Sequence, residues 1–179
     1  MKKQNQKQLT VEDIETVELK AYKDLGYDDS QRFEASLYIN DRRVAIVSND
    51  GNGGNHRYLW FDGRDKENVL HEYVEKLKKE GYFDETYKHY VEDIFPDGET
   101  PPIEIFMGVD DYINDLIDKF NLKKKCKRNT CFTLKSSEWG SYRVLKMPYS
   151  VKVKRILTEK FGTELKEILN ERFVEPLEM

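Results

Sequence analysis

The chain has 179 residues, of which 36% are charged, and a formal net charge of −4. This length suits one domain, or one domain with an appended subdomain, and 11 Tyr, 9 Phe and 2 Trp supply volume for a core, which argues against disorder. No stretch approaches the ~18 apolar residues of a membrane span. The basic N-terminus is not followed by the apolar run of a signal peptide. Two cysteines are too few for a disulfide scaffold. We therefore expect a cytoplasmic protein that does not enter a membrane.

The first part of the chain predicts an antiparallel meander after a flexible tail at residues 1–13. Residues 15–23 alternate, with Val17, Leu19 and Ala21 on one face, and residues 32–40 alternate more clearly, with Phe33, Leu37 and Ile39 facing one way. Asn40-Asp41 predicts a tight turn into a strand at residues 43–48, and "HRYLWF" at residues 56–61 predicts a fourth strand.

Helices are predicted after this sheet. Apolar residues of residues 65–80 recur on one helical face that we expect to pack on the strands, among them Leu70, Val74 and Leu77. A shorter helix is expected at residues 84–94, and a third begins at Asp110 or Asp111 and carries apolar residues as far as Phe120. Residues 96–102, "PDGETPP", break the pattern and are the best place for a subdomain boundary.

The C-terminal part predicts a β-hairpin from residues 131–134 and 142–146, followed by two helices. Ser150 is the expected cap of the first helix and Gly162 its end, while Leu165, Ile168 and Leu169 indicate a last helix from Thr163. The predicted fold class is therefore α+β, with an antiparallel N-terminal β-meander packed with helices, plus a C-terminal β-hairpin and two helices, in a single domain at residues 14–179.

The segment "FEASLYINDRRVAIVSNDGNGGNHRYLW", together with the later "YRVLKMPYS" and "KFG", resembles small uncharacterised proteins of phages and bacterial mobile elements that carry a strand, an NDGxGGN loop and an aromatic strand. This resemblance implies no particular fold, activity or functional residue. It favours an accessory or host-interaction role over core metabolism.

The loop at residues 49–55 is the strongest candidate binding site, because a plain hairpin needs only two turn residues. Glycine and asparagine tolerate positive φ, and consecutive backbone N–H groups in such a loop form a nest for an anion. Arg57 and Trp60 are expected to share one face beside the loop and to supply charge and a stacking surface, with Tyr58 pointing to the core. The predicted ligand-binding set, for an anionic or nucleotide ligand, is Asn49, Asp50, Gly51, Asn52, Gly53, Gly54, Asn55, Arg57 and Trp60.

Other interpretations of this loop stay open. It can be a mere connection between strands, as most such loops are. It lacks the lysine of a phosphate-binding P-loop and does not enter a helix as the dinucleotide-binding motif does. Its oxygens suit calcium, but Trp60 stands where a calcium loop that starts at Asn49 needs a bidentate Glu. The cysteines and histidines do not form a zinc-binding pattern, and we predict no metal site.

A basic patch is the second feature. Residues 121–160 contain twelve Lys or Arg and two Glu, a net charge of +10, so the rest of the chain carries −14. With Lys135, the patch would make a basic hairpin able to bind phosphates, although a solvated face is an equally ordinary interpretation. Because the chain is acidic overall, we expect weak, non-specific nucleic-acid binding at most. The patch comprises Lys123, Lys124, Lys125, Lys127, Arg128, Arg143 and Lys146.

These features predict a non-catalytic binding protein that holds an anionic ligand or a host component, for instance by sequestering a nucleotide signal to inhibit host defence. No catalytic residue and no cofactor is assigned. One alternative is a metal-dependent nuclease or phosphoesterase that uses Asp50 and the basic hairpin, and would need a second carboxylate near Asp50 in space. Another is an inhibitor that presents its acidic N-terminal two-thirds to a protein partner.

Overall fold

The computed structural model describes residues 9–61, 63, 65–95, 103 and 107–173. The chain divides into two compact units, Met1–Ile117 and Asp118–Met179. The boundary suggested by the sequence at residues 96–102 lies outside the described residues, as do residues 1–8 of the expected tail. None of the described helices is both long enough and apolar enough to cross a membrane.

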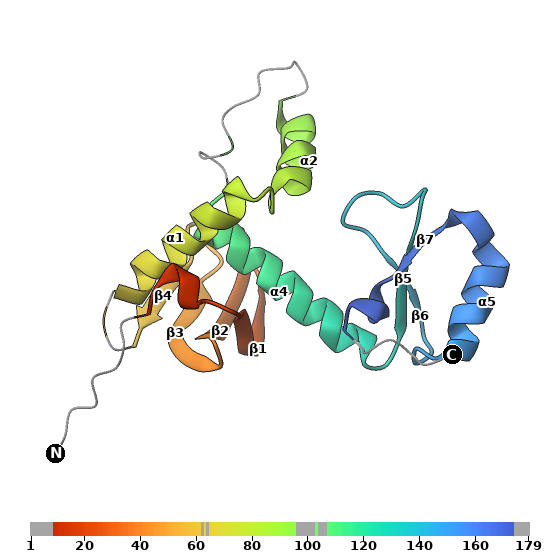
Figure 1. Cartoon of the computed structure of the whole chain (residues 1–179), viewed down its shortest axis with the longest axis horizontal. Coiled ribbons are helices and arrows are strands. Elements are labelled where there is room, and N and C mark those ends of the chain that lie inside the picture. Colours follow the sequence, from red (N-terminus) through yellow and green to blue (C-terminus); the bar gives the residue numbers. More distant parts are fainter. Residues whose placement is uncertain (1–8, 62, 64, 96–102, 104–106, 174–179) are drawn as a thin grey trace. The chain divides into compact units, whose positions relative to one another are not determined.

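The first unit contains a short 3-10 turn, a four-stranded sheet and helices (Figure 1). In chain order its elements are η1 (Val11–Asp13), β1 (Val17–Tyr27), β2 (Gln31–Ile39), β3 (Arg42–Asn49), β4 (Arg57–Trp60), α1 (Asp65–Lys79), α2 (Asp84–Ile94) and α4 (Val109–Cys126), whose last turns belong to the second unit.

The sheet is the predicted antiparallel meander, with strand order β1-β2-β3-β4. Leu37 of β2 lies opposite Ala45 of β3, and Val47 lies opposite Tyr58 of β4. Asn40 and Asp41 join β2 to β3 with φ values of 49° and 60°, the left-handed conformation that a two-residue hairpin turn requires. The alternation of apolar residues and the turn chemistry therefore specify this register together.

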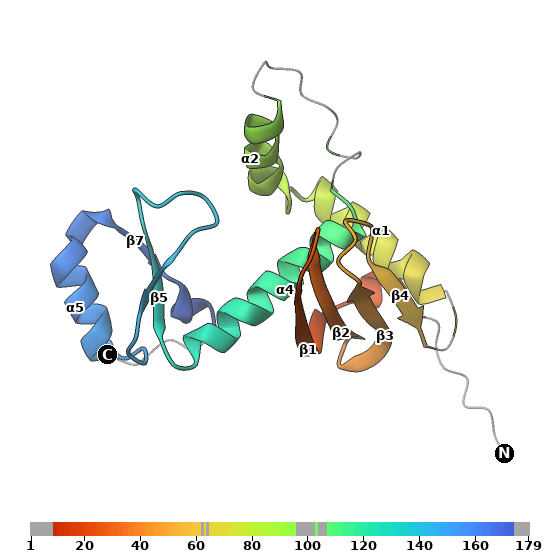
Figure 2. The same cartoon turned by 180° about the vertical axis from the view of Figure 1, so that it is seen from behind.

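The core of the first unit lies between one face of the sheet and helices α1 and α4 (Figure 1, Figure 2). Phe33, Leu37 and Ile39 are buried on this face. Leu70 and Val74 of α1 are buried in the same cluster, and Leu77 packs at its edge, as predicted. The cluster also takes in the apolar face of α4, which fixes the first turns of that helix against the sheet.

The alternation predicted for β1 is wrong beyond Leu19. Ala21 has a φ of 53° and is exposed, and the pairing with β2 shifts between Lys20 and Lys23. This bulge reverses the facing of the later residues. Tyr22 consequently takes the inward position and stacks on Phe33, with ring centroids 5.9 Å apart.

The second unit is a small sheet with one covering helix. Its elements are β5 (Thr130–Leu134), β6 (Arg143–Leu145), α5 (Val151–Phe161), η2 (Gly162–Glu164), β7 (Leu165–Ile168) and η3 (Leu169–Arg172), and the strand order is β6-β5-β7. Ser150 caps α5 by accepting from the backbone N–H of Val153, and Gly162 ends the helix with a φ of 52°, both as predicted.

The last predicted helix is instead strand β7, which pairs with β5. Leu165 and Ile168 lie opposite Leu134 and Phe132, and the register shifts between these two pairs. The irregularity brings both side chains onto the cluster with Val153 and Leu157 of α5. Apolar residues three positions apart usually lie on one face of a helix. Here a bulge places them on one face of a strand.

Truncation of Leu37 to Ala should lower the free energy of unfolding by about 2–5 kcal/mol, because the side chain is fully buried and its loss leaves a cavity. Leu59 is the matched control, since it lies on the same sheet and is 63% exposed; Leu59→Ala should change stability by no more than ~0.5 kcal/mol. Urea denaturation of both variants measures the difference, and equal values would contradict the packing described.

Candidate functional site

Asn49, the last residue of β3, closes the loop that follows the strand. Its side chain is 6% exposed and lies on the core face, opposite Phe33. The Oδ1 atom accepts from the Gly51 backbone N–H at 2.8 Å and from the Ser30 hydroxyl at 3.3 Å. The Nδ2 atom donates to the Gly54 carbonyl at 3.0 Å and to Nδ1 of His56, also at 3.0 Å. These four bonds use the full capacity of the amide.

Two of the three loop glycines are required by the loop's own conformation. Gly51 has a φ of +88°, and a Cβ there would lie 2.3 Å from Cγ of Arg32 and 3.2 Å from the Ser30 carbonyl. Gly53 has a φ of +70° and donates its N–H to the Ser30 hydroxyl at 3.2 Å. Gly54 does not have a positive φ, and a Cβ there would have no described neighbour within 4 Å. The fold therefore explains Gly51 and Gly53, and leaves Gly54 unexplained.

His56 joins the loop to α4. Because the Asn49 Nδ2 group can only donate, Nδ1 of the ring must accept, and the proton resides on Nε2. Nε2 donates to Oδ1 of Asn114 at 3.0 Å. The ring also meets Phe33 edge-on, with centroids 5.0 Å apart and an interplanar angle of 86°. Both nitrogens of the imidazole are thus engaged, and its position is fixed from three sides.

Asp110, in the first turn of α4, holds the start of β4. Its carboxylate accepts from the His56 backbone N–H at 2.8 Å and from the Tyr58 hydroxyl at 2.5 Å. Burial, reinforced by the bond to Asp110, raises the pKa of Tyr58. The neighbouring Asp111 accepts from the Gly108 N–H at 2.8 Å, and burial raises the pKa of its carboxyl. These contacts secure α4 next to the loop.

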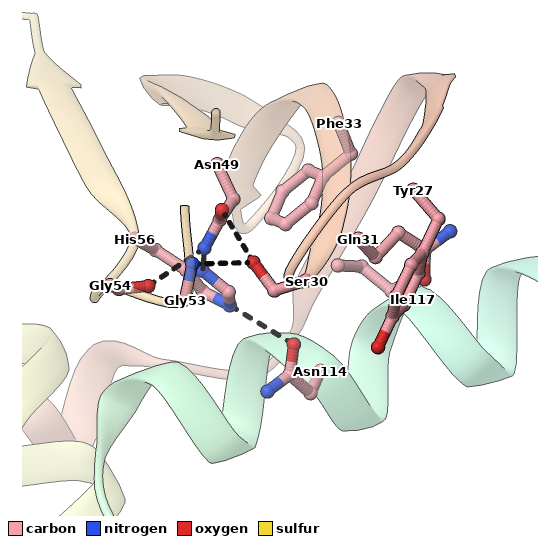
Figure 3. A pocket seen from close by; sticks show the side chains of 10 residues that line it. All are labelled: Tyr27, Ser30, Gln31, Phe33, Asn49, Gly53, Gly54, His56, Asn114 and Ile117. Carbon is pink, nitrogen blue, oxygen red and sulfur yellow. Dashed lines mark hydrogen bonds between the residues drawn. The ribbon is translucent and has the colours of Figure 1, made fainter. Parts of the chain in front are cut away.

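A pocket of about 270 Å³ lies between the loop, the β1–β2 turn and α4 (Figure 3). From the β1–β2 end its walls are Tyr27, Ser30, Gln31 and Phe33. From the loop and α4 they are Asn49, Gly53, Gly54, His56, Asn114 and Ile117. Figure 3 shows the loop and His56 on one side, and Tyr27, Gln31 and Ile117 on the other.

The pocket offers unused polar groups next to aromatic rings. Tyr27 is 77% exposed. Gln31 donates through Nε2 to the Tyr22 hydroxyl at 2.8 Å, which leaves its carbonyl oxygen for a ligand. Among the described residues, none bonds to Nδ2 of Asn114 or to the Tyr27 hydroxyl. Three residues that line the cavity therefore each carry a polar group without a partner among the described residues, while Asn49 and His56 are occupied in holding its shape.

The structure brings only part of the predicted loop site into this pocket, namely Asn49, Gly53 and Gly54. Asp50 lies outside and forms an ion pair with Arg57 at 2.5 Å. Asn52 and Asn55 are exposed, and their side chains have no partner in the part of the chain that the structure describes. The oxygens that would favour calcium are thus dispersed or occupied, since Asn49 bonds within the loop and Asp50 bonds to Arg57.

The predicted facing of Trp60 is wrong. Residues of a strand share a face at even spacing, so Arg57 and Trp60 point to opposite sides of β4. Arg57 is exposed, whereas Tyr58 and Trp60 pack against the core and stack with centroids 5.7 Å apart. The inward position of Tyr58 is confirmed. Trp60 therefore supports the sheet and does not line the pocket.

The basic patch lies in the second unit. Lys123, Lys124 and Lys125 extend α4 six residues beyond the predicted helix, because its apolar face continues to Leu122 and Cys126, which pack with Cys131 and Leu169. Lys127 and Arg128 follow in the turn to β5, Arg143 starts β6, and Lys146 comes directly after it. All seven side chains of the patch are exposed.

The described residues contain no group of three His, Cys, Asp or Glu placed to hold a metal ion. Cys126 and Cys131 are buried free thiols. Burial, with a hydrogen bond to the neighbouring Cys131, raises the pKa of Cys126 to about 12. A thiol with such a pKa is a poor nucleophile at neutral pH.

Sequence reasoning missed most of the pocket walls. Tyr27, Ser30, Gln31 and Asn114 carry no motif and are brought together only by the fold. One signal was present for the helix: Asp110 and Asn114 are four residues apart, so they lie on one helical face, and both bond to His56. Comparison with known proteins gave no match, whether to a family model, to a curated protein or to a solved structure.

Replacement of Asn49 by Ala should lower the free energy of unfolding by about 1–3 kcal/mol, because it leaves buried donors and acceptors around the loop without partners. Asn52→Ala removes the same side chain from an exposed position three residues away and should change stability by at most ~0.5 kcal/mol. Chemical denaturation compares the two. Equal stability of both variants would show that the Asn49 amide does not organise the loop.

Proposed function

We propose that the protein is a non-catalytic binding module whose pocket holds the planar, uncharged part of a small ligand, as the base of a nucleotide. The observation that carries this proposal is that Gln31, Asn114 and Tyr27, each with a polar group that has no partner among the described residues, line a cavity together with the rings of Phe33 and His56. Amide side chains read the edges of a base by paired hydrogen bonds, and aromatic rings take its faces.

The charges around the pocket favour an uncharged group inside it. No Lys or Arg is among the described residues that form its walls, and the nearby Arg57 is neutralised by Asp50. An anionic group of the ligand would lie at the mouth, where the backbone N–H groups of Gly54 and Asn55 have no hydrogen-bond partner among the described residues. Free N–H groups in a glycine-rich loop suit an anion.

The size of the cavity limits the ligand. Pockets for drug-sized ligands measure about 300–1,000 Å³, so 270 Å³ suits a single base or nucleoside and leaves no room for the second base of a dinucleotide. The position of Gly54 also suits contact with a ligand, because the fold leaves open space where its side chain would be.

Binding without chemistry is favoured by the state of the reactive groups. Both ring nitrogens of His56 are bonded to amides, and the Tyr58 hydroxyl is bonded to Asp110. The wall residues that the structure describes include no carboxylate. A nuclease or phosphoesterase built on Asp50 would have to break its ion pair with Arg57. Sequestration of a nucleotide signal needs only a pocket, and suits the accessory role expected for proteins of phages and mobile elements.

A second candidate function rests on charge. Residues 1–117 contain 26 Asp or Glu and 15 Lys or Arg, a net charge of −11. Such a surface could present itself to a basic host protein. This inhibitor would need no small ligand, so the two functions predict different responses to nucleotides.

A panel of nucleosides and nucleotides should contain a compound that raises the melting temperature by about 5–10 °C when present at 100 times its Kd. Tyr27→Ala, Asn114→Ala and Gly54→Ala should abolish this increase with little change in the melting temperature of the free protein, since all three positions are exposed. Leu25→Ala is the control: it removes an exposed apolar side chain from the same strand, outside the pocket.

Stabilisation by no compound of the panel would contradict the nucleotide proposal and favour the acidic inhibitor. A response that appears only with divalent ions would favour the enzyme. If Leu25→Ala and Tyr27→Ala lost the response equally, the ligand would bind elsewhere on the first unit.

A further inference from the structure

The second unit carries an excess of cations that its own carboxylates do not neutralise. Residues 118–179 contain fifteen Lys or Arg and eight Asp or Glu, a net charge of +7. Three carboxylates pair with cations away from the basic patch: Glu171 with Lys154 at 2.8 Å, Glu167 with Arg172 at 2.6 Å, and Glu159 with Arg155 at 3.6 Å.

The seven cations of the basic patch have a different environment. Among the described residues, no carboxylate lies within ion-pair distance of any of them. Lys125 alone has a partner, the ring and hydroxyl of Tyr142, with its Nζ 5.3 Å from the ring centroid. Like charges gathered without counter-charges repel one another and weaken the fold, so their presence on one surface favours a polyanionic partner.

Two contacts within the unit bring the two basic segments close to each other. The Thr130 hydroxyl donates to the Met147 carbonyl at 2.9 Å, which places the turn with Lys127 and Arg128 next to Lys146. The contact of Lys125 with Tyr142 brings the last turn of α4 to the start of β6. Strand β6 is at the edge of its sheet, so the patch follows an open edge.

Exposed apolar side chains lie on the same β5–β6 hairpin as Arg143 and Lys146. Trp139 in the β5–β6 connection is 55% exposed, and Val144 and Met147, which directly follow Arg143 and Lys146 in the sequence, are also exposed. Cations that bind phosphates, combined with an exposed indole that can stack on a base, are the pairing used to hold single-stranded nucleic acid. A duplex buries the faces of its bases and would leave the indole unused.

We infer that the basic patch, with Trp139, is a binding surface for single-stranded nucleic acid. The contacts would be to phosphates and base faces, so the surface would accept many sequences. The net charge of −4 for the whole chain does not oppose this binding, because charges further apart than the Debye length, about 8 Å at physiological salt, are largely screened. This site is independent of the pocket in the first unit.

The test uses the full chain and a fluorescein-labelled oligo(dT) of about 15 nucleotides, a length within the usual range of single-strand sites, with fluorescence anisotropy recorded at roughly 50–300 mM NaCl. The patch variant combines Lys127→Gln, Arg128→Gln and Lys146→Gln. The control variant combines Lys152→Gln, Arg155→Gln and Lys160→Gln, which removes the same charge from exposed positions on α5. The patch variant should lower the slope of log K against log salt by about 2, since each phosphate contact contributes about 0.7; the control variant should retain the wild-type slope.

Trp139 provides a second readout. Trp139→Ala should weaken binding about 5- to 150-fold, the effect of removing one stacked base. Trp139→Phe should retain most of the affinity but abolish the quenching of tryptophan fluorescence that the oligonucleotide causes, since the remaining Trp60 packs against the core of the first unit.

Three outcomes would overturn the proposal: no binding at the lowest salt concentration, equal losses in the patch and control variants, or displacement of the oligonucleotide by polyglutamate at equal charge concentration, which would indicate an acidic protein as the partner. Equally tight binding of a duplex of the same length, with no effect of Trp139→Ala, would refute the assignment to single strands.

Discussion

The buried amide of Asn49 is the interaction on which the candidate pocket depends. It lies at the end of β3 on the core face, where an unsatisfied polar group would cost several times the value of one exposed hydrogen bond. Its four bonds reach the β1–β2 turn, the loop and His56, and His56 carries the connection to Asn114 and Asp110 of α4. Because one side chain satisfies groups from all these segments, the loop and the pocket walls form as one unit with the sheet.

These hydrogen bonds give two glycines of the loop a structural role. A nest of backbone N–H groups would bind an anion only if those groups were available, but Gly51 and Gly53 donate to Asn49 and Ser30. Their positive φ values and the close approach of Gly51 to Arg32 explain their presence through the fold. The length of the loop serves to wrap around the Asn49 side chain and to bring His56 back over Phe33. What remains for a ligand is the cavity beside the loop, together with Gly54, so the recognition of an uncharged ring accounts for more of the geometry than the recognition of a phosphate alone.

Local rules were sufficient for much of the fold and for little of the site. The β2–β3 hairpin, helices α1 and α2, the first turns of α4 and the caps of α5 follow from alternation, helical period and turn residues. Two β-bulges produce patterns that these rules do not predict. One bulge turns Ala21 outward in β1, and the other places Leu165 and Ile168 on the same face of a strand. The placement of Trp60 beside Arg57 disregarded the two-residue period of a strand. Asn49, Gly53 and Gly54 could be found because their types are unusual for a strand connection, whereas Tyr27, Gln31 and Asn114 are common residues whose convergence depends on how β1, β2 and α4 pack.

The opposite charges of the two units suit the two proposed ligands in different ways. With a net charge of −11, the first unit repels phosphates except where local N–H groups compensate, so a bound nucleotide would gain most of its affinity from the base. With +7 and a surface of cations that lack carboxylate partners among the described residues, the second unit would gain most of its affinity from phosphates and would be indifferent to the base. Salt therefore separates the two modes physically: rising ionic strength weakens phosphate contacts through counterion binding, while hydrogen bonds and ring contacts in a 270 Å³ pocket respond little. The net charge of the whole chain is the sum of these two opposite charges, so it represents neither unit.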